Sequence, residues 1–418
     1  MSESEQLSEP ARPDSASRPD SGNPVEPALL AYQQHHRRAM RLYAAVLAVV
    51  VLLVFGGVRL AYAHGELDKV SRVSAAASAP IPVGSTGSAL AQRWHSSDRP
   101  AGGNPYADGI VVSYDSHTVN GRDAITGAVR WHYTRSDQTI CSVLQQDSST
   151  IAIYHRQGNC DEVTGFVTAT GAVKWYRTLT DNGRTSSASG PNVVLTVAAH
   201  SVHVFDNAGG LDRWNWVAPD GCSVNRALAG GQGVLIAMDC GSVHHLVLRD
   251  LTNDSQKWSI TVANPMAPVA AGALVGALDM VTGDLHRFTA DKGADTRTAR
   301  LLPPAAVAGA AAHLPRAATT VDTTDPQGQP VEFVWLDSLL ALSATGTVRW
   351  TAPASGPPWV IGTDLVASSL GGHTVLRQLA DGRQQRSVSL SPAPSGTFRS
   401  YPVGTGLLVA SDETAMYQ

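Results

Sequence analysis

The chain repeats one short phrase, first complete as Thr126-Gly127-Ala128-Val129-Arg130-Trp131, in which a turn leads into a strand that ends in a basic residue and a tryptophan. Glycine in the turn supplies the positive φ that a tight hairpin needs. The phrase returns at residues 170–175, 209–214, 253–258 and 345–350, and residues 92–94 carry its ending without the turn. Such recurrence indicates one structural unit used many times.

The spacing of the phrase gives the length of that unit. The tryptophans that end it, which we predict to fill the gaps between neighbouring sheets, are Trp94, Trp131, Trp175, Trp214, Trp258 and Trp350. Their separations are 37, 44, 39, 44 and 92 residues, and the last value fits two periods with one tryptophan lost. We expect the missing member where Lys292-Gly293 runs to Arg300-Leu301.

Two β-like runs precede each turn. Residues 109–114 and 192–197 are examples, rich in β-branched side chains and bounded by turn residues. Two strands, a hairpin turn and a Trp-ended strand, repeated about every 40 residues, are typical of a four-stranded propeller blade. We therefore predict an all-β fold in which residues 89–418 form an eight-bladed β-propeller, or a seven-bladed one if residues 260–330 are a single irregular blade. A pair of β-sandwiches, the alternative, has no reason to repeat a tryptophan phrase at fixed intervals.

The two ends of this region complement each other. Residues 406–411 and 414–417 resemble the inner strands of a unit whose Trp-ended strand never follows. Trp94, in contrast, ends a strand that has no inner strands before it. We predict that these segments complete one blade and so close the ring.

The N-terminal part predicts a membrane anchor. Residues 1–30 are rich in Ser, Pro, Glu, Asp and Ala, which indicates a disordered tail that we extend to residues 1–36. The segment from Leu42 to Tyr62 contains Arg59 as its only charge, and about 20 apolar residues suffice to cross a bilayer. We predict a single transmembrane anchor over 37–63. Arginines at positions 37, 38 and 41 place the tail in the cytoplasm by the positive-inside rule.

A cleaved signal peptide is the alternative, because Ala61-Tyr62-Ala63 resembles a cleavage site. The apolar core is longer than the roughly 7 to 15 residues usual in signal peptides, which favours the uncleaved anchor. Either reading exports residues 64–418, whose first part, residues 64–88, we predict to be a linker. The expected localisation is therefore the cell membrane, with the propeller outside the cytoplasm.

Composition excludes one class of partner. The chain has 43% apolar and 16% charged residues and a formal net charge of -4. No stretch of the C-terminal part concentrates Lys and Arg with aromatic residues between them, so we expect no nucleic-acid partner.

Four cysteines occur in two matching phrases. Cys141-Ser142-Val143 pairs with Cys160, and Cys222-Ser223-Val224 pairs with Cys240, at spacings of 19 and 18 residues. In an exported domain this pattern predicts two disulfides, each within one blade. A zinc site built from all four cysteines is the alternative, but no C-x-x-C spacing supports it.

The phrase resembles that of a known family. Ala124-Ile125-Thr126-Gly127 to Trp131 carries the complete A-x-T-G-x-x-x-W ending of the quinoprotein-like, PQQ-repeat β-propellers, which include BamB-like proteins, and Ser343-Ala344-Thr345-Gly346 to Trp350 repeats it with serine first. The similarity covers roughly residues 88–418. The anchor and the high alanine content also resemble membrane-anchored actinobacterial members.

This resemblance implies a fold more clearly than a function. Quinone-dependent dehydrogenases of this class typically carry an adjacent Cys-Cys ring, and no two cysteines are adjacent here. We therefore expect no cofactor and no enzyme activity. No nucleophile, zinc or phosphate-binding motif occurs.

Other residue types have ordinary structural explanations. His244 and His245 are neighbours on one predicted strand and point to opposite faces, so they are poorly placed to share a metal ion. His200 and His203 flank a strand start in the same way. Trp335 and Trp359 lie outside the repeated phrase; Trp359 follows Pro357-Pro358 in a predicted loop and is either an interaction anchor or a blade-edge residue.

Two functional hypotheses remain. The first is a non-catalytic interaction scaffold of the cell envelope that binds another membrane or exported protein. The second is a propeller that binds a small ligand or a polysaccharide, or an enzyme that uses the central channel. Carboxylates or histidines converging at the channel would favour the second. The sequence leaves the oligomeric state open.

Overall fold

The computed structural model describes residues 40–57, 69–156, 158–179, 186–301, 321–336, 338–362 and 365–418. The chain divides into two compact units, Met1–Asp68 and Lys69–Gln418. The predicted tail at residues 1–36 lies outside the described residues.

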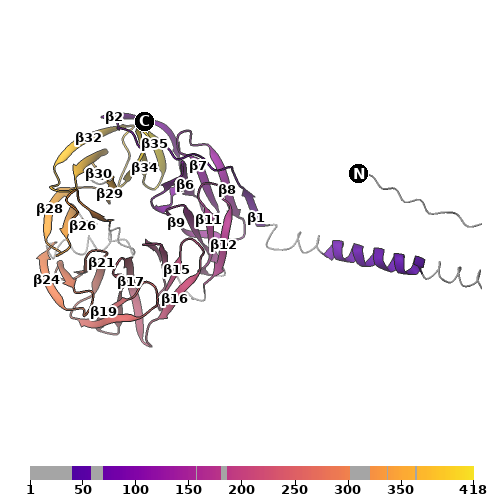
Figure 1. The fold of residues 1–418 in the computed structure, drawn as a ribbon, viewed down its shortest axis with the longest axis horizontal. Coiled ribbons are helices and arrows are strands. Elements are labelled where there is room, and N and C mark those ends of the chain that lie inside the picture. Colours follow the sequence, from indigo (N-terminus) through magenta and orange to yellow (C-terminus); the bar gives the residue numbers. More distant parts are fainter. Residues whose placement is uncertain are drawn as a thin grey trace, which may run out of the picture. The chain divides into compact units, whose positions relative to one another are not determined.

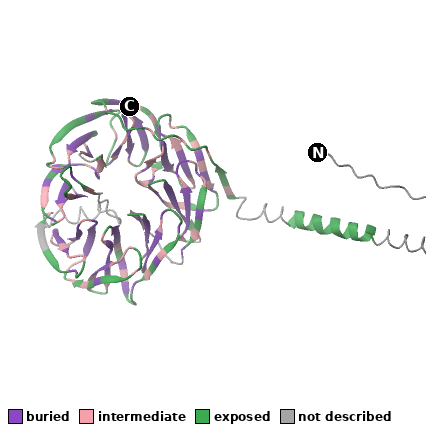
Figure 2. Cartoon of the chain, viewed as in Figure 1, coloured by how far each residue is buried: buried purple, intermediate pink, exposed green. Residues whose placement is uncertain are grey.

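The described part of the first unit is one helix, Met40–Gly57, whose 18 residues are long and apolar enough to cross a membrane. Its side chains are exposed along the whole length, as expected where lipid replaces a protein core (Figure 2). The helix coincides with most of the predicted span from Leu42 to Tyr62. Residues 58–68, which include the predicted cleavage site, lie outside the described residues.

The second unit is a β-propeller, as the repeat predicted (Figure 1). Its sheets surround a common centre, and we number them along the chain as blades. Blade 1 consists of β5 (Tyr106–Ala107), β6 (Ile110–Tyr114), β7 (Thr118–Asp123) and β8 (Val129–Arg135), with β3 (Arg99–Pro100) also paired to β6. Blade 2 consists of β9 (Thr139–Gln146), β10 (Ser149–Arg156), β11 (Asn159–Val167) and β12 (Val173–Thr178), with β4 (Gly102–Gly103) paired to β9.

The next four blades are regular antiparallel sheets of four strands. Blade 3 is β13 (Ser186–Gly190), β14 (Val193–Val197), β15 (Ser201–Asp206) and β16 (Asp212–Val217). Blade 4 is β17 (Cys222–Gly230), β18 (Gly233–Cys240), β19 (Val243–Arg249) and β20 (Gln256–Val262). Blade 5 is β21 (Met266–Ala271), β22 (Val275–Asp279), β23 (Asp284–Phe288) and β24 (Asp295–Arg300). Blade 6 is β25 (Val321–Thr324), β26 (Pro330–Trp335), β27 (Ser338–Ser343) and β28 (Val348–Pro353).

The last sheet has eight strands, which we divide into two blades. Blade 7 is β29 (Trp359–Ile361), β30 (Leu365–Leu370), β31 (His373–Gln378) and β32 (Gln384–Ser391). Blade 8 is β33 (Arg399–Val403), β34 (Gly406–Ala410), β35 (Thr414–Tyr417) and the N-terminal strand β2 (Ala89–Ser96). β2 pairs antiparallel with β35 and parallel with β32, so the start of the propeller does join its end.

The number of blades remains our interpretation of these sheets. The seven-blade alternative needed one irregular blade between residues 260 and 330. In that stretch the strand pairing instead begins two separate sheets, β21 to β24 and β25 to β28. The pairing therefore favours eight.

The tryptophans of the phrase lie between blades, on the turn of the next blade. A Cβ atom added to Gly171 would lie 2.6 Å from the Trp131 ring, and Gly127, Gly210, Gly293 and Gly382 meet Trp94, Trp175, Trp258 and Trp350 in the same way. Gly171 has φ +70°, so this turn needs glycine for its backbone as well as for its contact. Blade 5 is the blade that lacks the tryptophan of the phrase. Its turn at Gly293 precedes β24, and β24 contains no tryptophan.

The hydrophobic core is distributed over the seams between neighbouring blades. Each core cluster of the described residues combines side chains from two successive blades. Six of these seams contain a tryptophan of the phrase. The seams between blades 5 and 6 and between blades 7 and 8 contain none.

The predicted linker at residues 64–88 is partly folded, which corrects our boundary. The propeller unit begins at Lys69, twenty residues before the expected position 89. Within it, β1 (Val70–Val73) pairs antiparallel with β8. The following residues contact three blades through backbone hydrogen bonds, such as Ala75 N to Thr170 O and Gly84 N to Gly404 O at 3.0 and 2.7 Å.

Antiparallel strands give the propeller two distinct faces. The hairpins between first and second strands and between third and fourth strands lie on one, which we call the turn face. The hairpins between second and third strands and the segments from one blade to the next lie on the other, the connection face. Residues 75–84 run over the turn face, because Thr170 and Gly404 belong to its hairpins.

Candidate functional site

The connection face carries both disulfides in the predicted pairing. Cys141–Cys160 joins the innermost strand of blade 2 to its third strand, and Cys222–Cys240 joins the first two strands of blade 4. Among the described residues no cysteine is left free. In the chain-entropy model each closed loop of nearly 20 residues stabilises the fold by about 3 kcal/mol. Two blades are therefore braced at the same face.

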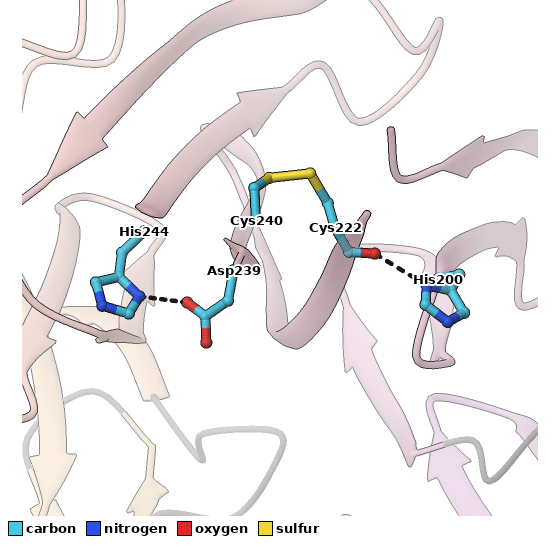
Figure 3. Close-up of a disulfide and its surroundings, with 5 residues drawn as sticks. All are labelled: His200, Cys222, Asp239, Cys240 and His244. Atoms are coloured by element: carbon cyan, nitrogen blue, oxygen red, sulfur yellow. Dashed lines mark hydrogen bonds and ion pairs between the residues drawn. A yellow bond between two sulfur atoms is a disulfide. The ribbon is translucent and has the colours of Figure 1, made fainter. Parts of the chain in front are cut away.

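Histidines in the hairpins of this face connect successive blades. His200 of blade 3 donates from Nδ1 to the carbonyl oxygen of Cys222 in blade 4, at 2.9 Å (Figure 3). His117 of blade 1 donates in the same way to Gln138 O, just before blade 2, at 2.7 Å. These contacts hold the first residues of an inner strand in place. Sequence reasoning assigned no such role to His200.

A buried ion cluster joins blades 1 and 2 at the same face. Glu162 is fully buried, and its carboxylate accepts hydrogen bonds from Arg156 and Gln138 at 2.8 and 2.5 Å. Arg135, at the end of blade 1, lies 3.3 Å from the same carboxylate and also pairs with Asp137. Burial and hydrogen bonding to Glu162 raise the pKa of Tyr176 to about 12. Charge-assisted hydrogen bonds of this kind are among the stronger ones, so the cluster helps to hold the two blades together.

Two concave sites open on the connection face. One, of about 320 Å³, is bounded by the segment from Pro392 to Ser395 and by His95 and Glu413, whose side chains lie 2.6 Å apart. The other, of about 370 Å³, lies between blades 3 and 4 beside Ala199 and Arg226. Both are at the lower end of the volumes typical of small-molecule sites.

Exposed aliphatic side chains also lie on the connection face. Val217 ends the outer strand of blade 3 and is 62% exposed, and Val243 lies in the connection-face hairpin of blade 4 at 42%. Val281, in the corresponding hairpin of blade 5, is 54% exposed. Apolar side chains beside hydrogen-bonding groups on a braced surface are typical of protein-binding faces.

The remaining candidates have structural contacts. His244 Nδ1 lies 2.6 Å from Asp239 Oδ1 in the same blade (Figure 3). Across the described ranges, no group of three or more His, Cys, Asp or Glu side chains is arranged to hold a metal ion. Trp359 begins β29 rather than lying in a loop, and its ring packs 4.9 Å from that of the buried Tyr401. Trp335 donates to Ala354 O at 3.2 Å.

The basic residue of the repeated phrase has a role that sequence reasoning missed. Lys174, immediately before Trp175, donates to the Ser149 hydroxyl at 3.2 Å, and Lys257 donates to Gln232 O at 2.8 Å. Arg349 likewise pairs with Asp325 at 2.7 Å. Each contact reaches the first hairpin of the same blade. The recurrence of Lys or Arg before Trp indicates that this position has a shared role. The groups that these side chains contact are not adjacent in sequence, so the pattern alone does not identify them.

Comparison with known proteins gives a family and a set of similar structures. Residues 85–299, which are 215 of the 418, match the family described as outer membrane protein assembly factor BamB. No curated protein sequence matches the chain.

Three solved structures illustrate the similarity. BamB from Moraxella catarrhalis is 16% identical, with a TM-score of 0.46 over 79% of this chain and 99% of that one. The computationally designed Ika8 protein is 13% identical, with a TM-score of 0.53 over the same shares. Quinohemoprotein alcohol dehydrogenase from Comamonas testosteroni is 12% identical, with a TM-score of 0.45 over 78% and 76%. Of these three, the similarity to Ika8 has a TM-score above 0.5, and at 13% identity it speaks for the fold alone. The family match, the repeated phrase and the strand pairing agree: the chain belongs to the BamB-like family of PQQ-repeat β-propellers.

Proposed function

We propose that this protein is a non-catalytic interaction scaffold of the cell envelope, anchored by the helix Met40–Gly57, with its propeller outside the cytoplasm. It binds an envelope or exported protein through the connection face. The observation that carries the proposal is that this face combines the bracing disulfides, the inter-blade histidine contacts and exposed aliphatic side chains. A rigid surface loses little conformational entropy when a partner binds.

The anchor and the disulfides support the extracytoplasmic placement. Structural disulfides form and persist in oxidising compartments. Arg37 and Arg38 precede the helix and Arg41 lies in its first turn, which favours a cytoplasmic N-terminus. A reporter enzyme that is active only outside the cytoplasm, fused after Gln418, is expected to be active. Cytoplasmic activity of a matched reporter at the same position would contradict this topology.

Site-specific cross-linking tests the face. Leu211 and Val217 lie at opposite ends of the outer strand of blade 3. Leu211 directly precedes β16 at the turn face, and Val217 ends β16 at the connection face; they are 61% and 62% exposed. A photo-reactive amino acid at position 217 should give a reproducible adduct with an envelope protein in living cells. The same group at position 211 should not. Equal labelling from both positions would contradict docking at the connection face.

A ligand-binding function is the second candidate, favoured by the 320 Å³ site beside His95 and Glu413. This function requires that a soluble ligand, such as an envelope polysaccharide fragment, bind at this site. Saturable binding of such a fragment that is lost in a Glu413→Gln variant would favour this candidate over the scaffold.

A further inference from the structure

The strand β1 is attached to the outside of the propeller. It pairs antiparallel with β8, the outer strand of blade 1, from Val70 opposite Arg135 to Val73 opposite His132. Ser136 N donates to Lys69 O at 3.0 Å and continues the ladder by one residue. β1 therefore covers an edge that otherwise presents unpaired backbone groups to solvent.

Beyond these backbone bonds, Ser71 Oγ lies 3.4 Å from His132 Nε2, and the residues that follow β1 are held by bonds such as Ala75 N to Thr170 O. Three of the four residues of β1 are exposed, and Val73 is 49% exposed. Only Val70, together with Ala75, packs against the core cluster around Trp131 and Tyr154. The other added N-terminal strand, β2, differs because it buries Leu90 and Ser96 and completes a blade.

Polar groups around β1 show which kind of strand fits. Asp137 follows Ser136, whose amide donates to Lys69 O, and the Asp137 carboxylate pairs with Arg135 at 3.1 Å. Burial raises the pKa of Asp137, but Arg135 and, to a smaller extent, Lys69 lower it below the usual value. A basic residue is therefore favoured at the position of Lys69 and a branched aliphatic residue at Val70. The exposed positions that follow, residues 71–73, place little demand on the side chain.

We propose that the outer edge of β8 is a strand-addition site, which β1 fills in the isolated chain and an extended segment of a partner protein fills in its place. The occupant is an antiparallel strand with a basic residue followed by a branched aliphatic residue, held mainly by backbone hydrogen bonds. This surface lies on the rim of blade 1 and is separate from the connection face. The proposal therefore does not depend on the proposed function.

The amides of β8 provide a direct test in the unmodified full-length protein. Arg135 N donates to His117 O and Ser136 N donates to Lys69 O, so antiparallel alternation directs the Tyr133 amide to β7 and the Thr134 amide to β1. If β1 opens locally, Thr134 should exchange its amide hydrogen at least a hundredfold faster than Tyr133. Equal, slow exchange at both positions would overturn the proposal.

A peptide-binding experiment tests whether the outer edge of β8 binds an added strand once β1 is displaced. The same alternation directs the Ser71 N–H toward β8 and the Arg72 N–H toward solvent. Ser71→Pro in the full-length protein therefore removes a ladder bond, whereas Arg72→Pro introduces the same ring at an edge position that tolerates it. The probe is a fluorescent peptide of residues 69–80.

We expect this peptide to bind the Ser71→Pro protein at least tenfold more tightly than it binds the wild type or the Arg72→Pro protein. A peptide that itself contains Ser71→Pro should bind at least tenfold more weakly than the unmodified peptide. Absence of saturable binding to the Ser71→Pro protein, or equal affinity for all three proteins, would overturn the proposal. Neither outcome bears on cross-linking at Val217.

Discussion

The seam between blades 1 and 2 and the seam between blades 5 and 6 join similar sheets with different side chains. In the first, the fully buried Trp131 lies on Gly171 and donates to Thr168 O at 2.8 Å. In the second, the cluster contains Ala, Val and Leu side chains such as Leu278 and Leu340, and no tryptophan. The comparison shows that the tryptophan is one way to fill a seam. At five seams it lies against a glycine in a turn of the next blade, whereas opposite Trp214 the corresponding turn residue is Asp254, which has φ +60°.

The largest expected effect is loss of a seam tryptophan. Trp131→Ala should reduce the free energy of unfolding by about 3–5 kcal/mol, because it removes a buried aromatic ring and leaves a cavity. Val129→Ala, on the same strand but 46% exposed, is the control and should change stability by less than about 0.5 kcal/mol. Chemical denaturation of the full-length protein would measure both. Similar midpoints for the two variants would show that Trp131 is not a seam plug.

The contact of Gly171 with the Trp131 ring can be tested separately from the left-handed backbone conformation of this glycine. Gly171 and Gly241 have φ of +70° and +66°, but an added Cβ meets the Trp131 ring at 2.6 Å in the first and nothing within 4 Å in the second. Both alanine substitutions incur the left-handed penalty of about 1–2 kcal/mol. Gly171→Ala should cost about 1–3 kcal/mol more, because the ring must shift. Equal losses in thermal unfolding would show that only backbone strain matters.

The repeated phrase was sufficient to predict most of these contacts. It located the blade period, the tryptophans, the turn at Gly293 and the joining of residues near Trp94 to the C-terminus, because each depends on a local pattern that recurs. It did not predict β1, whose residues Val70–Val73 lie outside the period and pair with a strand about 60 residues later. It also missed the His200 contact with Cys222, since a lone histidine in a hairpin carries no signal of its acceptor.

The closing seam between blades 8 and 1 combines its tryptophan, Trp94, with a hydrogen-bonded carboxylate that we expect to make it sensitive to acid. Asp98 follows β2 and accepts hydrogen bonds from Arg122, Asn120 and Ser113 at 2.6, 3.1 and 3.2 Å. Burial raises the pKa of this carboxyl, but the hydrogen bonds and the charge of Arg122 lower it below its ordinary value of 3.8. The contribution of the Asp98 carboxylate to the free energy of unfolding is therefore present above about pH 4, and it is lost as the pH falls through the folded-state pKa.

Asp98→Asn should accordingly cost about 1–3 kcal/mol at pH 7, because charged hydrogen bonds are lost. The difference from wild type should shrink as the pH falls toward 3. Denaturation midpoints between pH 3 and 7 would measure it, with the exposed Asp412→Asn as control. A difference that stays constant over this range would exclude titration of Asp98 as its source.

The smallest expected effect is at the seam between blades 7 and 8, where the end of β35 and the start of β2 stand in the place of the glycine turn. Four residues after Gly382, at the position of a seam tryptophan, stands the exposed Arg386, which donates to Thr86 O. Gln418 and Ala89 occupy the place where the other blades have the turn between third and fourth strands, so a tryptophan there has no turn to cover. Arg386→Ala should change stability by less than about 0.5 kcal/mol. Arg386→Trp should not stabilise the protein, and a raised unfolding midpoint in that variant would show that a tryptophan can fill this seam without a turn opposite.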